Sequence, residues 1–314
     1  MLPRVVVHAD WSTDPRKRWM ATAALDGDVY RVSRPAPVEQ SAALVPSAVH
    51  SASGGCAVLG FDFPIGVPKA YAQVAHIESF LDVLPELGTG RWKRFYDLAS
   101  RPDEVSIDRP FYPFRPGGTL QAHLVKGIGV RSIDALLRRC DFGNEHRNKA
   151  CALFWTLGGN QVGRAAISGW REVLVPAIRS LEGQLGVWPF HGELNSLINS
   201  RLCVIAETYP ADACVQLGLP GPGRGWSKRN REDRIAQGLK LIRWGNGKAV
   251  DLRGVKAVVE DGFGSADVGE DQFDAVVGLL GMLAVILGVR SDGIPIDHST
   301  RRIEGWILGQ RSHG

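Results

Sequence analysis

The chain has no long apolar run and no paired cysteines. Its most apolar stretch, residues 275–289, is shorter than the roughly 20 residues that a membrane-spanning helix needs. The amino terminus lacks the basic region and apolar core of a signal peptide. The five cysteines are an odd number without a Cys-x-x-Cys pair, which argues against a disulfide framework or a zinc site. We therefore expect a cytoplasmic protein with buried free thiols and no membrane partner.

Phosphate-binding loops and a strong net charge are also lacking. Residues 158–163 read Gly-Gly-Asn-Gln-Val-Gly, without the Gly-Lys-Ser/Thr of a phosphate-binding loop. The net charge is +4, from 37 basic and 33 acidic residues. This balance permits a polyanionic partner without requiring one. The length of 314 residues allows one large domain or two modest ones.

Three apolar runs each end in a carboxylate. They are Val5–Asp10, Ala57–Asp62 and Leu202–Glu207. Short apolar runs bounded by polar breaks are typical of buried strands in a largely parallel sheet. Ligands of open α/β sheets bind at the carboxyl ends of such strands. We therefore expect these carboxylates to converge at one edge of the sheet.

A second group of acids opens the final apolar segment. We predict a long helix that begins at Gly269, so that Asp271 and Asp274 share a face of its first turn. First-turn acids also favour the helix dipole, which is a simpler explanation for Glu270 and Asp271. The dipole does not explain why Asp274 precedes an almost wholly apolar stretch.

Converging carboxylates repel one another and raise each other's pKa unless a cation lies among them. Oxygen ligands of this kind suit Mg²⁺ or Mn²⁺. We therefore predict a centre of one or two ions in which one activates the attacking water and the other stabilises the leaving oxygen. The predicted metal ligands are Asp10, Asp62, Glu207, Asp271 and Asp274. Asp10 and Asp62 alone could equally be turn or cap residues.

The pattern along the chain predicts a mixed α/β sheet with a helical insertion. Strands are expected at 4–10, 17–25, 28–34, 56–62 and 202–207, with a hairpin at Asp26-Gly27. Helices are expected at 39–53, 133–140, 173–185, 211–217 and 229–244, besides the final one. Residues 67–200 are too long for a loop, so we predict a mostly helical insertion there, with an irregular loop at 101–118.

The order of these elements resembles the ribonuclease H-like fold. That fold has three meander strands, a helix, a fourth and a fifth strand and a closing helix. It carries metal-binding carboxylates on the first strand, the fourth strand and the closing helix, where this chain has Asp10, Asp62 and the pair Asp271 and Asp274. The acid pair is similar to that of resolvase-type Holliday-junction nucleases. The resemblance implies one domain over 1–314, with a five-stranded sheet flanked by helices.

The whole chain also resembles the family called domain of unknown function 429, a predicted ribonuclease H-like nuclease group. The motifs that carry this resemblance are Asp62-Phe-Pro-Ile-Gly, Phe154-Trp-Thr-Leu-Gly-Gly-Asn-Gln-Val-Gly, Glu207-Thr-Tyr-Pro, Glu270-Asp-Gln-Phe-Asp-Ala and Ile303-Glu-Gly-Trp-Ile-Leu-Gly. The first strand reads Val-His-Ala-Asp10 where Gly-Ile-Asp is commoner. The resemblance implies a metal-dependent nuclease.

Candidate contacts to nucleic acid come from basic and glycine-rich segments. The densest basic cluster precedes and opens the helix at 229–244, and such a cluster is either a solvated helix face or a phosphate-binding surface. Arg94 lies in a run that mixes cations with an aromatic residue. The predicted substrate-binding residues are Lys228, Arg229, Arg231, Arg234, Gln161 and Arg94. By contrast, we expect His8 to be a packed core residue and Glu304 to bond a backbone amide or an arginine.

The favoured hypothesis is hydrolysis of phosphodiester bonds in RNA or DNA, with Asp10, Asp62, Glu207 and Asp274 as the catalytic carboxylates. One alternative is a small-molecule phosphotransferase or phosphatase of the actin-like kinase type. Such kinases need glycine-rich phosphate-binding hairpins in two related domains, and the hairpin at Asp26-Gly27 is too tight for one. The other alternative is a non-catalytic nucleic-acid-binding module with the same fold.

Overall fold

The computed structural model of the chain describes residues 1–143, 148–157, 162–221 and 223–311. These residues form two compact units. Unit 1 combines residues 1–62, residues 177–294 and the segment that begins at Ile307. Unit 2 combines residues 63–176 with residues 295–306. Residues 177–200, which the sequence assigns to the insertion, therefore belong to unit 1.

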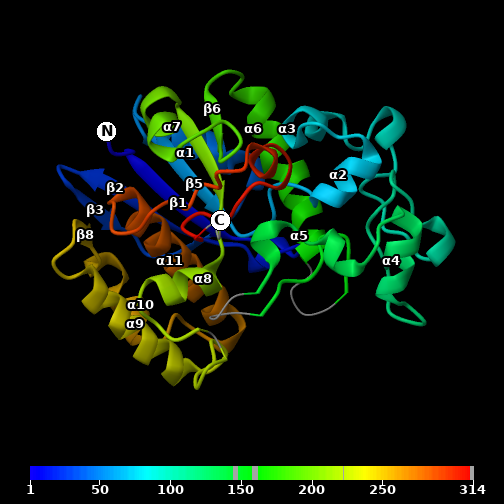
Figure 1. Ribbon diagram of the computed structural model, residues 1–314. Coiled ribbons are helices and arrows are strands. Elements are labelled where there is room, and N and C mark those ends of the chain that lie inside the picture. The colour runs from blue at the N-terminus through cyan, green and yellow to red at the C-terminus, as the bar shows by residue number, and fades with distance from the viewer. Residues whose placement is uncertain (144–147, 158–161, 222, 312–314) are drawn as a thin grey trace. The chain divides into compact units, whose positions relative to one another are not determined.

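Unit 1 is built around a mixed eight-stranded sheet (Figure 1). Its strand order is β6-β7-β5-β1-β2-β3-β8, and β4 pairs with β2. Strand β2 is antiparallel to both β1 and β3, whereas β1, β5, β7 and β6 run parallel. The strands are β1 (Val5–Asp10), β2 (Trp19–Asp26), β3 (Val29–Val32), β4 (Ala36–Pro37), β5 (Ala57–Phe61), β6 (Leu185–Trp188), β7 (Cys203–Glu207) and β8 (Val250–Asp251). The three predicted meander strands and the two parallel strands are confirmed.

The prediction of five strands is wrong, because β4, β6 and β8 are two to four residues long and give too little pattern. The helix predicted at 173–185 also ends earlier than expected, because the chain enters β6 there. The helix α6 (Val175–Ser180) ends at Ser180. Gly183 then adopts a φ of +70°, which a turn can use and a helix cannot, and the chain enters β6 at Leu185.

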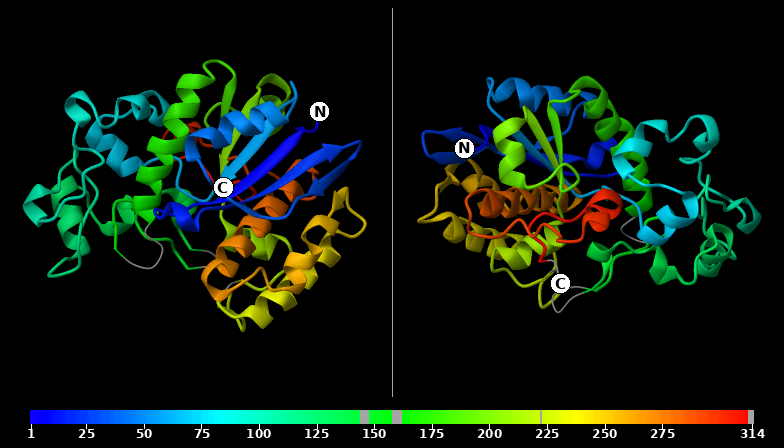
Figure 2. Two further views of the ribbon diagram at one scale, coloured as in Figure 1. Left: turned by 180° about the vertical axis from the view of Figure 1, so that it is seen from behind. Right: turned by 45° about the horizontal axis from the view of Figure 1, so that its top comes forward.

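Helices cover both faces of this sheet. Helix α11 lies against β1 and β2, and α8 and α9 pack on α11. Helix α1 contacts β1 and β5 from the other side (Figure 2). We call the two sides the α11 face and the α1 face. The helices of unit 1 are α1 (Ser41–Ser51), α7 (Leu194–Ser200), α8 (Pro210–Gln216), α9 (Arg231–Gly245), α10 (Lys256–Glu260) and α11 (Ala266–Ile286), together with α6 from Ala177 onwards and the short turns η1 (Pro15–Lys17) and η8 (Arg253–Val255).

Two glycines let α11 lie close to the sheet. A Cβ atom at Gly278 of α11 would collide with the imidazole ring of His8 on β1. A Cβ atom at Gly60 on β5 would collide with the Met282 sulfur of α11. His8 and Gly60 are opposite each other in the register, so both side-chain positions lie on the α11 face. His8 is fully buried, as predicted, and burial lowers its pKa to about 3.

In the described part of unit 2, every named element is helical. The elements are α2 (Lys69–Ala75), α3 (Phe80–Val83), η2 (Leu84–Glu86), η3 (Gly90–Trp92), η4 (Pro102–Glu104), α4 (Gln121–Ile128), η5 (Ile133–Leu136), η6 (Arg139–Asp141), α5 (Val162–Gly169), η7 (Trp170–Leu174) and η9 (Thr300–Glu304). Aromatic rings form its core. The ring centroids of Tyr71 and Phe154 are 4.5 Å apart, and those of Phe95 and Phe111 are 5.6 Å apart. Aromatic pairs at such distances stabilise a core beyond the area that they bury.

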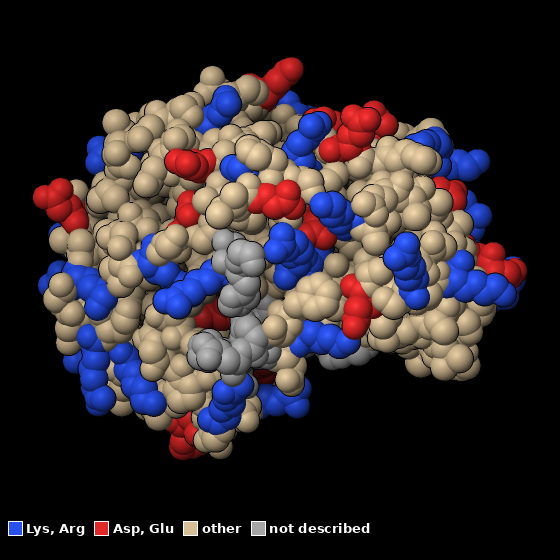
Figure 3. Space-filling view, in the orientation of Figure 1, with Lys and Arg blue, Asp and Glu red and all other residues tan. Residues whose placement is uncertain are grey.

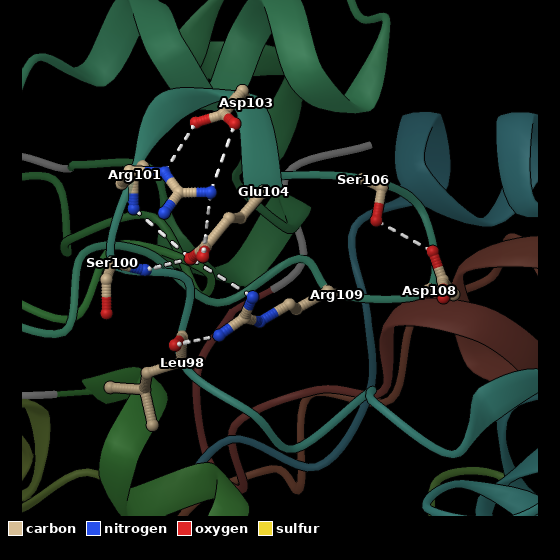
Figure 4. A network of polar contacts seen from close by, with 8 residues as sticks. All are labelled: Leu98, Ser100, Arg101, Asp103, Glu104, Ser106, Asp108 and Arg109. Carbon is tan, nitrogen blue, oxygen red and sulfur yellow. Dashed lines mark hydrogen bonds and ion pairs between the residues drawn. The ribbon is translucent and has the colours of Figure 1, made fainter.

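A charge network holds the segment at 101–118, which is irregular as predicted (Figure 4). Glu104 Oε2 accepts hydrogen bonds from the backbone N–H groups of Ser100 at 2.7 Å and Arg101 at 3.3 Å. Arg109 pairs with the same carboxylate at 3.0 Å and donates to the Leu98 carbonyl at 2.8 Å. These bonds satisfy backbone groups that have no partner in a helix or strand.

Candidate metal centre

Two aspartates meet at the carboxyl ends of β1 and β5. Asp10 is the last residue of β1, and Asp62 follows directly after β5. Ala9 pairs with Phe61 in the parallel register, so the next residues along the two strands are neighbours on the same face. Asp62 Oδ1 accepts the backbone N–H of Trp11 at 2.6 Å. This convergence was predicted from the strand ends.

Helix α11 supplies two further aspartates from the α11 face. The helix begins at Ala266 and not at the predicted Gly269, so Asp271 lies in its second turn and Asp274 in its third. The dipole of a helix acts mainly within its first turn. The explanation of Glu270 and Asp271 as first-turn acids is therefore wrong. Their place is set by the packing of α11 on β1, which brings them towards Asp10.

The four aspartates act on one another electrostatically. Burial raises the pKa of Asp10 well above its ordinary value, and the charges of Asp62, Asp274 and Asp271 raise it further. Burial raises the pKa of Asp62 to about 7, with Asp274 adding to the rise. Burial also raises the pKa of Asp271 to about 6 and that of Asp274 above its ordinary value. Groups that perturb each other in this way lie in one cluster.

Lys228 is a cation inside this cluster, and the charge of Lys17 also acts on Asp271, where it lowers the pKa. The Lys228 Nζ atom forms an ion pair with Asp274 Oδ2 and lies 3.7 Å from Glu270 Oε1, and the Lys228 side chain is only 20% exposed. Burial alone would lower the pKa of Lys228, but the charges of Asp274 and Glu270 outweigh it and raise this pKa above the ordinary value. Lys228 therefore stays protonated at neutral pH. The sequence places it in a basic run, and nothing in that run shows that it faces acids.

The oxygen donors of the cluster fit Mg²⁺ or Mn²⁺ in kind. Asp274 Oδ1 and Asp271 Oδ2 are buried and have no hydrogen-bond partner. Thr208 Oγ1 is likewise buried and unpartnered, and the Thr208 methyl group faces Gly60 from the end of β7. Among the described residues, however, no three His, Cys, Asp or Glu side chains converge closely enough to hold a metal ion as they lie. Metal binding at this cluster therefore requires the carboxylates to draw together.

The structure does not bring Glu207 into the cluster. Glu207 pairs with Phe61 in the register between β7 and β5, so the two side chains lie on the same face. That face is the α1 face, because the preceding residue Gly60 faces α11. Glu207 is buried there, on the opposite side of the sheet from Asp10. The prediction therefore places Glu207 at the correct end of its strand but on the wrong face of the sheet.

We therefore expect Glu207→Gln to leave Mn²⁺ affinity, measured by calorimetry, unchanged. The same substitution should lower the free energy of unfolding by roughly 1–3 kcal/mol, because Glu207 is buried and an amide cannot keep every interaction of a buried carboxyl group. Asp274→Asn is the matched comparison and should weaken Mn²⁺ binding. A Glu207→Gln protein that loses Mn²⁺ binding while it stays folded would place Glu207 back among the ligands.

The predicted basic cluster divides into buried and exposed members. Arg234 is fully buried, and it donates to the carbonyl oxygens of Lys228 at 2.7 Å, Gly262 at 2.7 Å and Gly264 at 3.2 Å. Its prediction as a substrate contact is wrong, because its guanidinium is committed to the backbone. The side chain of Arg229 is 89% exposed, and that of Arg231 is 48% exposed. On the face drawn in Figure 3, Lys and Arg side chains gather over the part of unit 1 that contains α9 and α10.

The remaining candidate residues lie outside this basic cluster. Arg94 is exposed in unit 2, and Gln161 lies outside the described residues. Glu304 is buried and accepts the backbone N–H groups of Lys69 at 3.0 Å and Arg139 at 3.1 Å, which confirms its predicted structural role.

Without divalent metal, stability should fall as the pH rises from about 4 to about 7. The unfolded Asp62 carboxyl titrates near 3.8 and the folded one near 7, so the folded chain binds the extra proton between these values. At about 1.4 kcal/mol per pKa unit, the contribution is at most roughly 4 kcal/mol. Denaturant unfolding in EDTA at several pH values measures it, and Asp62→Asn should flatten the dependence. A stability that rises over this range and is insensitive to Asp62→Asn would contradict the raised pKa.

Comparisons of the chain with family models, with curated proteins and with solved structures found no match. Among the described residues, no helix has the length and apolar character needed to cross a membrane. All five cysteines are free thiols, and four of them are buried.

Proposed function

We propose that this chain is a metal-dependent nuclease with a ribonuclease H-like core, of the group named domain of unknown function 429. The order of β1, β2, β3, α1, β5, β7 and α11 along the chain supports this assignment. So does the placing of aspartates at the end of β1, directly after β5 and on α11. These are the three places at which that fold carries its metal ligands.

The observation that carries the proposal is the meeting of four aspartates from three distant segments. Asp10 and Asp62 are 52 positions apart and Asp274 lies more than 200 positions further on, yet their charges act on one another. Buried carboxylates that serve packing alone would be replaced at little cost by apolar or amide side chains. A divalent cation is the ligand that turns their repulsion into attraction.

In this proposal Asp10, Asp62 and Asp274 hold the metal, and Asp271 supports them. A bound divalent cation would supply a water of lowered pKa and would stabilise the developing charge on phosphate oxygens. Asp62 is oriented for this role by the Trp11 N–H on its Oδ1 atom. Asp274 pairs with Lys228 through its Oδ2 atom, and its Oδ1 atom is buried without a partner. Glu207 has no role in the centre.

The proposed substrate is nucleic acid, whose backbone suits the exposed cations near the centre. Arg229 follows Lys228 directly, and Arg231 opens α9. Both side chains also reach acids, Arg229 to Glu270 at 3.9 Å and Arg231 to Asp261 at 2.7 Å. Exposed ion pairs of this kind are weak, so phosphate groups can compete for the guanidinium groups.

The test is a cleavage assay on single-stranded DNA, duplex DNA, RNA, RNA–DNA hybrid and branched DNA. We expect at least one substrate to be cut in Mn²⁺ or Mg²⁺ and none in EDTA. Cleavage that persists in EDTA would contradict the proposal. Mn²⁺ binding without turnover on any substrate would instead favour a non-catalytic binding module.

A further inference from the structure

Lys228 is held in place by its backbone, independently of its charged end. Its carbonyl accepts a hydrogen bond from Arg234 Nη1 at 2.7 Å. The same guanidinium bonds the carbonyls of Gly262 and Gly264, in the segment that leads into α11. Trp226, two residues before Lys228, packs on Phe273 of α11 with ring centroids 5.6 Å apart. The loop that carries Lys228 is therefore fixed to the helix that carries Asp274.

The ammonium group of Lys228 lies against Asp274, one of the proposed metal ligands. It forms an ion pair with Asp274 Oδ2 and lies 3.7 Å from Glu270 Oε1. Its charge also reaches Asp10 and Asp271. The other carboxylate oxygen of Asp274, Oδ1, has no hydrogen-bond partner and is shielded from water, because the residue is only 8% exposed. One side of the carboxylate is thus neutralised by the chain and the other is open to a ligand.

We propose that Lys228 is a built-in counter-ion of the aspartate cluster and that a divalent cation bound at Asp274 competes with its ammonium group for this carboxylate. This inference rests on the proposed metal centre. An ammonium ion and a divalent cation repel each other when they share a carboxylate in a partly buried site. The lysine side chain has four methylene groups and an exposed portion, so it can swing out while its backbone stays fixed.

Lys228 has opposite effects in the metal-free and the metal-bound protein. Without metal, its charge offsets the repulsion among the aspartates and so stabilises the fold. With metal, its ammonium group competes with the divalent cation for Asp274 and weakens the affinity of the cluster for that cation. Removing its charge should therefore destabilise the metal-free protein and tighten metal binding. Removing a residue that only holds a metal ligand in place would instead weaken metal binding.

The experiment compares wild type, Lys228→Met and Lys240→Met by Mn²⁺ calorimetry and by thermal unfolding with and without Mn²⁺. Lys240 is exposed on α9, and its ammonium group donates a hydrogen bond to Gln237 at 2.9 Å. Lys240→Met therefore removes the same charge at a position outside the aspartate cluster. We expect Lys228→Met to bind Mn²⁺ at least about tenfold more tightly and to melt lower in EDTA, because the competing cation is gone. Lys240→Met should behave as wild type in both measurements.

A second measurement uses the wild-type protein alone and does not depend on the variant's folding. Amine-reactive labelling of Lys228, quantified by peptide mass spectrometry, should rise when Mn²⁺ is added, because the displaced amine becomes accessible. Equal Mn²⁺ affinity in wild type and Lys228→Met, or labelling that Mn²⁺ does not change while it binds, would overturn the inference and leave the nuclease proposal standing. No Mn²⁺ binding to either protein would overturn both.

Discussion

Asp10→Asn and Asp274→Asn should each lower metal-dependent cleavage of nucleic acid by roughly 100- to 1,000-fold, because each removes an anionic ligand that would hold the catalytic metal ion. Asparagine keeps the size of the side chain and one oxygen, so packing is preserved while the negative charge is lost. Removal of the raised-pKa carboxylate of Asp10 should also stabilise the metal-free fold, whereas Asp274→Asn also removes the partner of Lys228 and should not. Loss of activity together with unchanged or higher stability is therefore the pattern expected for Asp10→Asn.

The control for this prediction is Glu207→Gln, which removes a buried carboxylate of the same sheet edge on the α1 face. It should retain cleavage. Rates are to be measured as single-turnover kinetics at saturating Mn²⁺, so that a change in metal affinity is separated from a change in chemistry. Full activity of both Asp10→Asn and Asp274→Asn would remove the cluster from the mechanism.

Asp141→Ala should lower the free energy of unfolding by about 3–5 kcal/mol, because it leaves a buried guanidinium without its carboxylate. Arg138 is 1% exposed and donates to both oxygens of Asp141, at 3.1 Å and 2.8 Å. It also donates to the carbonyl of Glu304 at 3.3 Å, so it ties the segment around η9 to the rest of unit 2. Urea unfolding followed by circular dichroism measures the loss.

The matched control is Asp103→Ala in the same unit. Asp103 pairs with Arg101 at 3.1 Å, but both side chains are about two-thirds exposed (Figure 4). Such a pair is screened by water, so its removal should leave the unfolding curve nearly unchanged. Equal destabilisation by the two substitutions would show that burial of the Arg138 pair adds nothing.

The sequence predicted the sheet well where apolar runs are long. The runs that end at Asp10 and Asp62 are continuous apolar segments bounded by polar residues, and the apolar stretch after Asp274 is long, and the structure places them as β1, β5 and α11. Strands of two residues, such as β8, carry no period and were missed. The start of α11 was placed late because the residues before Gly269 show no apolar repeat.

The candidate site was predicted in part, and its errors have physical causes. Glu207 failed because a shift of one residue in the register moves a side chain to the other face, and single strands do not reveal their register. Lys228 and Arg234 were read together as a basic surface, although one pairs with Asp274 and the other bonds backbone carbonyls. Both contacts join segments about 30 to 45 residues apart, which local pattern cannot show.

The most direct test of the central claim is anomalous diffraction from a crystal soaked in Mn²⁺. The account predicts a peak within bonding distance of carboxylate oxygens from Asp10, Asp62 and Asp274, with the Lys228 ammonium group moved away from Asp274. An ordered cluster that keeps the Lys228–Asp274 ion pair and shows no peak at saturating Mn²⁺ would contradict it.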